Sequence, residues 1–314
     1  MNPTPTPADH SRAGLLYGIT CYTLWGIFPL YFIQLEFAPA LEIVAHRVLW
    51  SVVVCMILLT VTRRLPEFLA VLRNPRQLGA LAIAAALITC NWLTYVYATN
   101  NGHVLQASLG YFINPLLTIL LGVVLLRERL RPMQWLAVAI GLIAIVVIAA
   151  GQGSPPWIAL ALTLTFGFYG LSKKLAGRSI APIPSLTIET LLVAPVALIA
   201  LLWMTQHGES HLLAHGISSA LLLSSTGIAT TIPLIAFAAA ARRLPLSMLG
   251  MLQYIGPILQ FLVAVVILHE PMSPARWAGF VLVWIALVLI TIDALHHNHR
   301  NNRLRRAELE STAA

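Results

Sequence analysis

Three ionisable side chains lie close together within an otherwise apolar stretch. Glu42, His46 and Arg47 fall inside residues 40–61, where most of the neighbouring residues are apolar. Glu42 and His46 are four residues apart and share one face of a helix, and Arg47 lies about 100° further round. A guanidinium in such a place could bind an anionic group of a small molecule. The alternative is a structural role, in which Arg47 snorkels outward to the membrane surface or fixes one helix to another, with Glu42 as its partner.

A second acidic side chain interrupts a different apolar stretch. Glu189 lies about six residues into residues 183–204. Ionisable groups at membrane depth are rare and often belong to ion or proton pathways, so Glu189 could take up and release a proton. The alternative is again structural: Glu189 hydrogen-bonds its neighbours or pairs with Arg47.

Polar and aromatic residues recur near the middle of other apolar stretches. They are Asn91, Trp92 and Tyr95 in residues 77–99, Tyr111 and Asn114 in residues 104–126, and Gln253 and Tyr254 in residues 246–268. Together they predict a polar cavity for a small amphipathic ligand, although any one of them could simply hydrogen-bond between helices. Pro115 and Pro257 are hinge candidates, because each removes a backbone hydrogen bond; the alternative is a static bend.

The composition determines the environment in which these residues must be positioned. Apolar residues make up 59% of the chain, charged residues only 10%, and the mean hydropathy is +0.83. Soluble domains are about 25% charged, so the chain is predicted to be an integral membrane protein. Its three cysteines, Cys21, Cys55 and Cys90, lie in apolar runs without metal-binding or redox spacing. With no phosphate-binding glycine motif either, we expect no cofactor and no metal.

Ten segments are long and apolar enough to cross about 30 Å of hydrocarbon. They are residues 13–35, 40–61, 77–99, 104–126, 132–150, 155–176, 183–204, 217–240, 246–268 and 274–294. The connection after the second segment holds an apolar run between arginines, and it predicts a short interfacial helix.

The positions of the basic residues predict the orientation of these segments. If the N-terminus is cytoplasmic, only Arg276 falls outside and Arg47 falls within a span, which leaves 17 of the 19 lysines and arginines on the cytoplasmic side. Both termini are then cytoplasmic. The net charge of +8 follows from this topology and gives no reason to expect a nucleic-acid partner.

One segment of the chain occurs twice, 142 residues apart. Residues 112–148 match residues 254–290 at 14 of 37 positions without a gap, including the pairs Pro115 with Pro257 and Glu128 with Glu270. We expect these two glutamates, each at the end of a span, to fix hairpins, with Arg127 and Arg129 as local partners of Glu128.

The repeat and the span count together predict an all-α integral membrane protein with ten transmembrane helices in a 5+5 inverted-topology repeat. The predicted parts are a polar N-terminus (1–12), a first five-helix repeat (13–150), a second inverted repeat (151–295) and a basic cytoplasmic tail (296–314). An odd number of spans in each copy turns the second copy upside down. This architecture is typical of secondary transporters, whose two halves alternate access to a central site.

Several motifs resemble one known family. The run 107–115 (Ala-Ser-Leu-Gly-Tyr-Phe-Ile-Asn-Pro), residues 253–257 (Gln-Tyr-Ile-Gly-Pro), and the short motifs at 24–26, 46–47, 91–92 and 188–190 are similar to the RarD branch of the EamA family, in the drug/metabolite transporter superfamily. The resemblance covers about residues 13–295. It implies ten helices, cytoplasmic termini, a central cavity and an exporter or metabolite-carrier role in the inner membrane of a bacterial cell.

The sequence therefore favours a secondary transporter that exports a small organic metabolite or drug-like solute. Its expected partners are the solute, protons or an exchanged solute, and the lipid bilayer. An intramembrane enzyme is a weaker alternative, because His46 is the only histidine well inside a span and no serine or metal set accompanies it. A passive channel is the other alternative, although no pore-forming motif is present.

Overall fold

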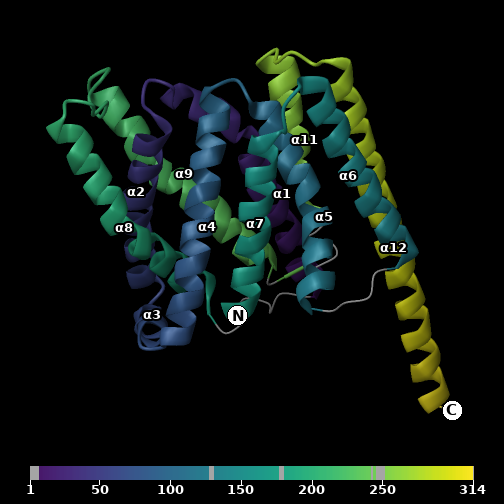
Figure 1. Cartoon of the computed structure of the whole chain (residues 1–314). Coiled ribbons are helices and arrows are strands. Elements are labelled where there is room, and N and C mark those ends of the chain that lie inside the picture. Colours follow the sequence, from purple (N-terminus) through teal and green to yellow (C-terminus); the bar gives the residue numbers. More distant parts are fainter. Residues whose placement is uncertain (1–6, 127–130, 177–179, 242, 245–251, 314) are drawn as a thin grey trace. The chain divides into compact units, whose positions relative to one another are not determined.

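The structure, a computed structural model, describes the chain except for residues 1–6, 127–130, 177–179, 242, 245–251 and 314. All the regular secondary structure of the described residues is helical (Figure 1). In chain order the elements are α1 (Pro7–Phe32), η1 (Ile33–Leu35), α2 (Ala40–Val61), α3 (Leu65–Leu72), α4 (Pro75–Asn100), α5 (Val104–Leu126), α6 (Pro132–Gln152), α7 (Trp157–Ala176), α8 (Pro182–Gln206), α9 (Ile217–Ala241), α11 (Ile255–Leu262), η2 (Val263–Ile267) and α12 (Pro274–Ala313).

The helices group into two compact units. The first comprises Met1–Tyr111 with Trp157–Glu270, and the second Phe112–Pro156 with Pro271–Ala314. Each unit therefore combines helices from both halves of the sequence. These two units are not the two predicted sequence repeats, residues 13–150 and 151–295, whose boundaries stay a prediction.

In the first unit, α2 packs against both α8 and α9, α4 packs against α7, and α1 packs against α9 and α11. Small residues allow α9 to approach α2 closely, and α5 to approach α7. A methyl group on Gly227 of α9 would lie 2.4 Å from the backbone carbon of Trp50 on α2, and one on Gly110 would lie 2.7 Å from the carbonyl oxygen of Ala159. Such backbone approaches are characteristic of helix packing within membranes.

In the second unit, α6 and α12 run along each other beside the rest of α5. Leu116 of α5, Ala137 and Val138 of α6, and Ala286 of α12 form a buried cluster. Arg131, just before α6, pairs with Asp293 of α12 at 2.6 Å. These contacts hold one end of the unit by an ion pair and the rest by apolar packing.

Many helices present apolar side chains on their outer surfaces. Leu142, Ile143 and Val146 of α6 and Val196 and Ile199 of α8 are all more than half exposed. Seven helices in the described part of the chain are long and apolar enough to cross a membrane, and Val104–Leu117, Trp157–Ser172 and Ile255–Ile267 are shorter apolar helices. A soluble protein rarely exposes so much contiguous apolar surface, so these faces fit contact with lipid.

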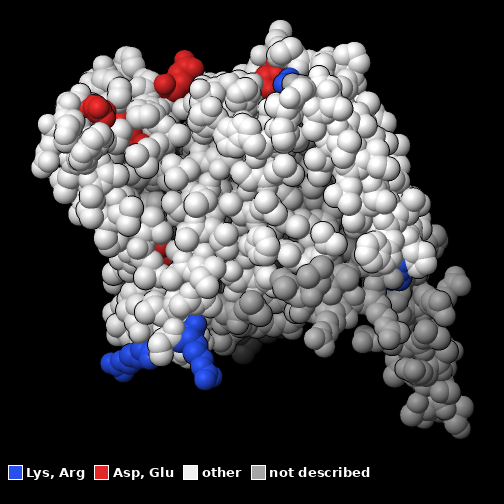
Figure 2. Space-filling view, in the orientation of Figure 1, with Lys and Arg blue, Asp and Glu red and all other residues white. Residues whose placement is uncertain are grey.

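Charged side chains of the first unit gather at its ends. Arg63, Arg64, Arg73 and Arg76 flank α3 at the C-terminal end of α2, whereas Glu36 and Glu42 lie at the opposite end of that helix. Figure 2 shows several acidic groups at the upper end of the view, where one basic group lies beside them, and basic groups at the lower end.

The helix predicted after the second span is confirmed as α3. The basic tail continues α12 as a helix to Ala313. Pro115 lies inside α5, but Pro257 lies in the first turn of α11, where a backbone N–H has no acceptor within the helix. Pro257 therefore costs α11 no hydrogen bond, in contrast to the kink expected there. Arg127, Glu128 and Arg129 lie outside the described residues.

Candidate functional site

Arg47 lies in the interior of the first unit, and its side chain is held by aromatic rings. The residue is 4% exposed. Its guanidinium carbon lies 4.3 Å from the ring centre of Trp92 and 5.4 Å from that of Phe32, and its Nε donates a hydrogen bond of 2.6 Å to Thr230 Oγ1. Stacking on aromatic faces stabilises a buried cation in part.

No carboxylate forms an ion pair with Arg47 in the part of the chain that the structure describes. Nε is also its only nitrogen with a hydrogen bond to a described side chain or backbone group. A buried charge is costly unless it is paired and hydrogen-bonded. Arg47 therefore keeps the capacity to bind an anion.

Three tyrosines lie near the guanidinium. Tyr31, Tyr95 and Tyr111 all lie within electrostatic range of Arg47. Tyr31 shares a hydrogen bond of 2.7 Å with Ser225. Tyr95 is 4% exposed, and its hydroxyl has no hydrogen-bond partner among the described residues. Since buried hydroxyls are normally hydrogen-bonded, Tyr95 adds a second unsatisfied polar group beside Arg47.

Asn91 connects three helices next to these rings. Its side-chain nitrogen donates to Leu162 O at 3.2 Å and to Thr165 Oγ1 at 3.0 Å, both on α7, and its oxygen accepts from Tyr111 Oη at 3.0 Å. This network fixes the position of the Tyr111 ring. We call the set formed by Tyr31, Arg47, Asn91, Trp92, Tyr95, Tyr111 and Thr230 the Arg47 cluster.

The structural alternative for Arg47, in which Glu42 is its partner, is not found in the structure. The Glu42 carboxylate is 0% exposed and accepts from the backbone N–H of His211 at 2.7 Å, from Ser210 Oγ at 3.2 Å and lies 2.9 Å from His211 Nδ1. It therefore fastens the connection between α8 and α9 to the start of α2. His46 is buried on the same face of α2 as Glu42. Sequence reasoning missed His211, which lies in a connection with no apolar pattern around it.

Glu189 is also engaged elsewhere, so the suggested pairing with Arg47 is not formed. One carboxylate oxygen accepts from Ser185 at 2.9 Å, and the other from Tyr169 at 3.3 Å. The residue is 2% exposed. Glu189 thus links α7 to α8 within the first unit.

The Arg47 cluster does not include the remaining predicted residues. Gln253 and Tyr254 precede α11, and neither forms a hydrogen bond to the Arg47 cluster within the described residues. Asn114 and Pro115 belong to the second unit. Of the residues predicted from sequence, the structure brings Arg47, Asn91, Trp92, Tyr95 and Tyr111 together.

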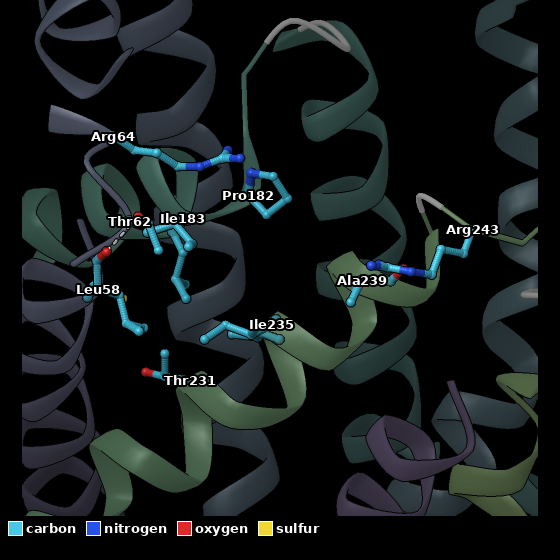
Figure 3. Close-up of a pocket in the computed structure, with 12 residues that line it drawn as sticks. Leu58, Thr62, Arg64, Pro182, Ile183, Thr231, Ile235, Ala239 and Arg243 are labelled. Carbon is cyan, nitrogen blue, oxygen red and sulfur yellow. Dashed lines mark hydrogen bonds between the residues drawn. The ribbon is translucent and has the colours of Figure 1, made fainter. Parts of the chain in front are cut away.

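A cavity of about 320 Å³ lies between α2, α8 and α9 of the first unit. Figure 3 shows Arg64 and Arg243 at one end of this cavity and Thr231 at the other. The lining residues are Cys55, Leu58, Thr62, Arg64, Pro182, Ile183, Leu186, Thr231, Leu234, Ile235, Ala239 and Arg243. None of them was expected to form a site. The apolar ones carry no distinguishing signal in the sequence, and Arg64 and Arg243 were counted among the basic residues on the cytoplasmic side.

The comparison with known families decides the class of the protein. Residues 12–150 match the EamA-like transporter family, and residues 155–292 match it a second time. The chain belongs to the EamA-like transporter family. It therefore contains two EamA repeats, as the internal sequence match predicted, and it is a multi-pass membrane transporter and not an enzyme.

Relatives of this EamA protein are similar to it in sequence over nearly its whole length. The RarD protein of Streptomyces exfoliatus is 48% identical over 97% of this chain and 95% of its own. The RarD protein of Escherichia coli is 41% identical over 94% of this chain and 99% of its own. An uncharacterized transporter of Pseudomonas aeruginosa is 43% identical over 90% of this chain and 94% of its own.

One solved crystal structure of a protein has the same fold. It is 21% identical, covers 90% of this chain and 98% of its own, and gives a TM-score of 0.60. The predicted resemblance to RarD-like members of the EamA family is thus confirmed by sequence, and the helical fold by structure.

Proposed function

We propose that this EamA transporter is a secondary carrier that exports a small organic solute with an anionic group by alternating access. The observation that carries this proposal is the Arg47 cluster: a buried guanidinium without a carboxylate partner among the described residues, stacked on Trp92 and beside the unsatisfied hydroxyl of Tyr95. A planar anion could accept hydrogen bonds from both groups while its apolar part contacts the aromatic rings.

The proposed topology has ten spans, with five in each inverted repeat and both termini in the cytoplasm of a bacterial cell, whose inner membrane holds the protein. The distribution of basic residues supports it, since only Arg276 falls outside and only Arg47 within a span. The seven long and three shorter apolar helices of the described residues are compatible with that count. In this topology the basic end of the first unit, around α3, faces the cytoplasm.

Transport would be driven by protons or by solute exchange. Glu189 is the candidate proton carrier, because it is a buried carboxylate that bonds to two hydroxyl groups on different helices. Loss and gain of a proton would change those bonds and could therefore change the packing of α7 against α8. Pro115, which lies inside α5, remains a hinge candidate, whereas Pro257 loses the ground on which it was expected to be one. Gln253, Tyr254 and Asn114 remain candidates for solute contact.

A binding experiment tests the central element of this proposal. Purified protein is titrated with benzoate and with the neutral benzamide, and ligand binding is followed as an increase in melting temperature. We expect benzoate to stabilise the wild type more than benzamide does. Arg47→Gln should weaken benzoate binding by about 10- to 100-fold, the factor for losing a charge-assisted hydrogen bond. The matched control is Arg76→Gln, which removes an exposed arginine next to α3.

Transport by the same variants is then measured in liposomes. Saturable uptake that Arg47→Gln abolishes and Arg76→Gln preserves would support a carrier with its site at Arg47. Uptake that rises linearly with concentration would favour the channel alternative. Equal binding of benzoate by Arg47→Gln and the wild type would refute the anion site.

A further inference from the structure

We propose that the cavity between α2, α8 and α9 is the loading vestibule of this transporter, and that it admits small amphipathic organic anions on their way to Arg47. This inference rests on the proposed carrier function. It adds an entry site and a charge preference, both at residues outside the Arg47 cluster, and a route that leads to that cluster.

The ends of the cavity differ in chemistry. At its exposed end lie Arg64, whose side chain is 27% exposed, and the exposed Arg243. Among the described residues, the one polar contact of the Arg64 guanidinium is a 3.6 Å ion pair with the exposed Glu67, a type of contact that contributes little. Arg243 Nη1 donates to the carbonyl of Ala239. Both guanidinium groups therefore retain free donors for a carboxylate or a similar anion.

The walls of the cavity are apolar, and its inner end is not. Leu58, Ile183, Leu234 and Ile235 form the walls, whereas Cys55 and Thr231 lie at the buried end. A volume of about 320 Å³ is at the small end of the range for ligand sites. The cavity suits a compact molecule with one anionic group and a short apolar body.

One face of α2 connects the lining of the cavity with Arg47. Thr62, Leu58 and Cys55 line the cavity, and Ser51 and Arg47 follow at further steps of four residues, which keeps all five on the same face. Ser51 is 0% exposed, and its hydroxyl has no hydrogen-bond partner among the described residues. At 1.5 Å per residue, Arg47 lies about 12 Å beyond Cys55.

Helix α9 follows the same course on the other side. Thr231 lines the cavity, and the preceding residue, Thr230, holds Arg47. The route is thus marked by a guanidinium group at each end and by hydroxyl groups between them. This arrangement also argues against a lipid acyl chain as the occupant, because a chain tail would meet hydroxyl groups where it needs an apolar end.

Cysteine labelling tests the charge preference of the cavity. In a chain with Cys21, Cys55 and Cys90 replaced by alanine, Leu58→Cys places a thiol in the cavity wall. Ile57→Cys is the matched control, because Ile57 has the same depth on α2 but is 56% exposed. Each protein, in nanodiscs, reacts with two methanethiosulfonates of similar size, the anionic sulfonatoethyl and the cationic trimethylammonioethyl compound.

We expect Leu58→Cys to react faster with the anionic reagent, on the order of tenfold, and Ile57→Cys to show no such preference. The preference should disappear with Arg64→Gln and Arg243→Gln together. It should persist with Arg73→Gln and Arg76→Gln, which remove two exposed charges from the same end of the unit. Octanoate should slow the labelling of Leu58→Cys, whereas octylammonium should not.

Equal rates with the two reagents, or equal protection by octanoate and octylammonium, would overturn the proposal. It would also fall if anionic phospholipid in the nanodisc slowed labelling and octanoate added nothing, since the cavity would then be a lipid site. Arg47→Gln separates this proposal from the carrier function. If Arg47→Gln abolishes transport but Leu58→Cys shows no labelling preference, the vestibule alone is refuted. If Leu58→Cys shows the labelling preference but Arg47→Gln transports normally, the Arg47 site is refuted.

Discussion

Replacing Glu270 by glutamine tests how the start of α5 is held in the first unit. The Glu270 carboxylate accepts from the backbone N–H of Val104 at 2.6 Å and of Leu105 at 3.0 Å, and the residue is 8% exposed. The first N–H groups of a helix have no acceptor within that helix. Glu270 therefore caps α5, a role more distant in sequence than the hairpin contact expected for it.

The expected cost follows from these two bonds. A hydrogen bond to a charged group contributes about 1.5–3 kcal/mol, and a negative charge at a helix N-terminus adds about 0.3–1 kcal/mol. Glutamine keeps one acceptor oxygen, so Glu270→Gln leaves one N–H without a partner and should lower the free energy of unfolding by about 2–3 kcal/mol. Glu270→Ala loses both bonds and should cost about 4 kcal/mol.

Unfolding by SDS in mixed micelles, followed by circular dichroism, measures both variants. The control is Glu209→Gln, which neutralises an exposed glutamate and should change the stability by less than about 0.5 kcal/mol. If Glu270→Gln is as stable as that control, the carboxylate does not cap α5. If Glu270→Ala costs no more than Glu270→Gln, the remaining oxygen of glutamine makes no bond and the magnitudes above are wrong.

Two further predictions concern packing in the first unit and use the same unfolding assay. Asn91→Leu removes the bonds between α4 and α7 and deprives Tyr111 of its acceptor, so it should destabilise the protein by about 2–4 kcal/mol; a near-neutral result would contradict the proposed network. Gly227→Ala places a methyl group against the backbone of Trp50 and should cost about 1–3 kcal/mol. Its control, Gly79→Ala in α4, meets nothing within 4 Å and should stabilise by up to about 1 kcal/mol; equal effects would show that α2 and α9 can separate without cost.

Arg47 illustrates what could be predicted about the site. A charge within an apolar span is conspicuous in any sequence, because so few residues of that kind can be buried. The aromatic and amide residues near it, Asn91, Trp92, Tyr95 and Tyr111, were conspicuous for the same reason. Their assembly around one guanidinium depends on the contacts of α2 with α9, α4 with α7, and the first turns of α5, which no local pattern specifies.

The pairing of the acidic residues shows the opposite case. The sequence shows that Glu42 and Glu189 are acidic residues within apolar stretches, and it suggests Arg47 as a possible partner for each. Glu42 instead binds His211, 169 residues away in sequence, and Glu189 binds Ser185 and Tyr169. Several donors are chemically equivalent for a carboxylate, so the choice among them depends on which helices are neighbours.

The sequence by itself determined that this is a helical membrane protein of the EamA family and that residues 112–148 are repeated at 254–290. It also determined which polar side chains lie within apolar helices. Hydrophobic periodicity, charge distribution and motifs are local properties of the sequence, so they can be recognised without the tertiary structure. Only the tertiary structure decided that Arg47 lacks a carboxylate partner in the described part of the chain, that Glu270 caps a helix starting 166 residues earlier, and that a cavity lies between α2, α8 and α9. These features depend on the distances between residues far apart in the chain, because hydrogen bonds and cavities form between packed helices.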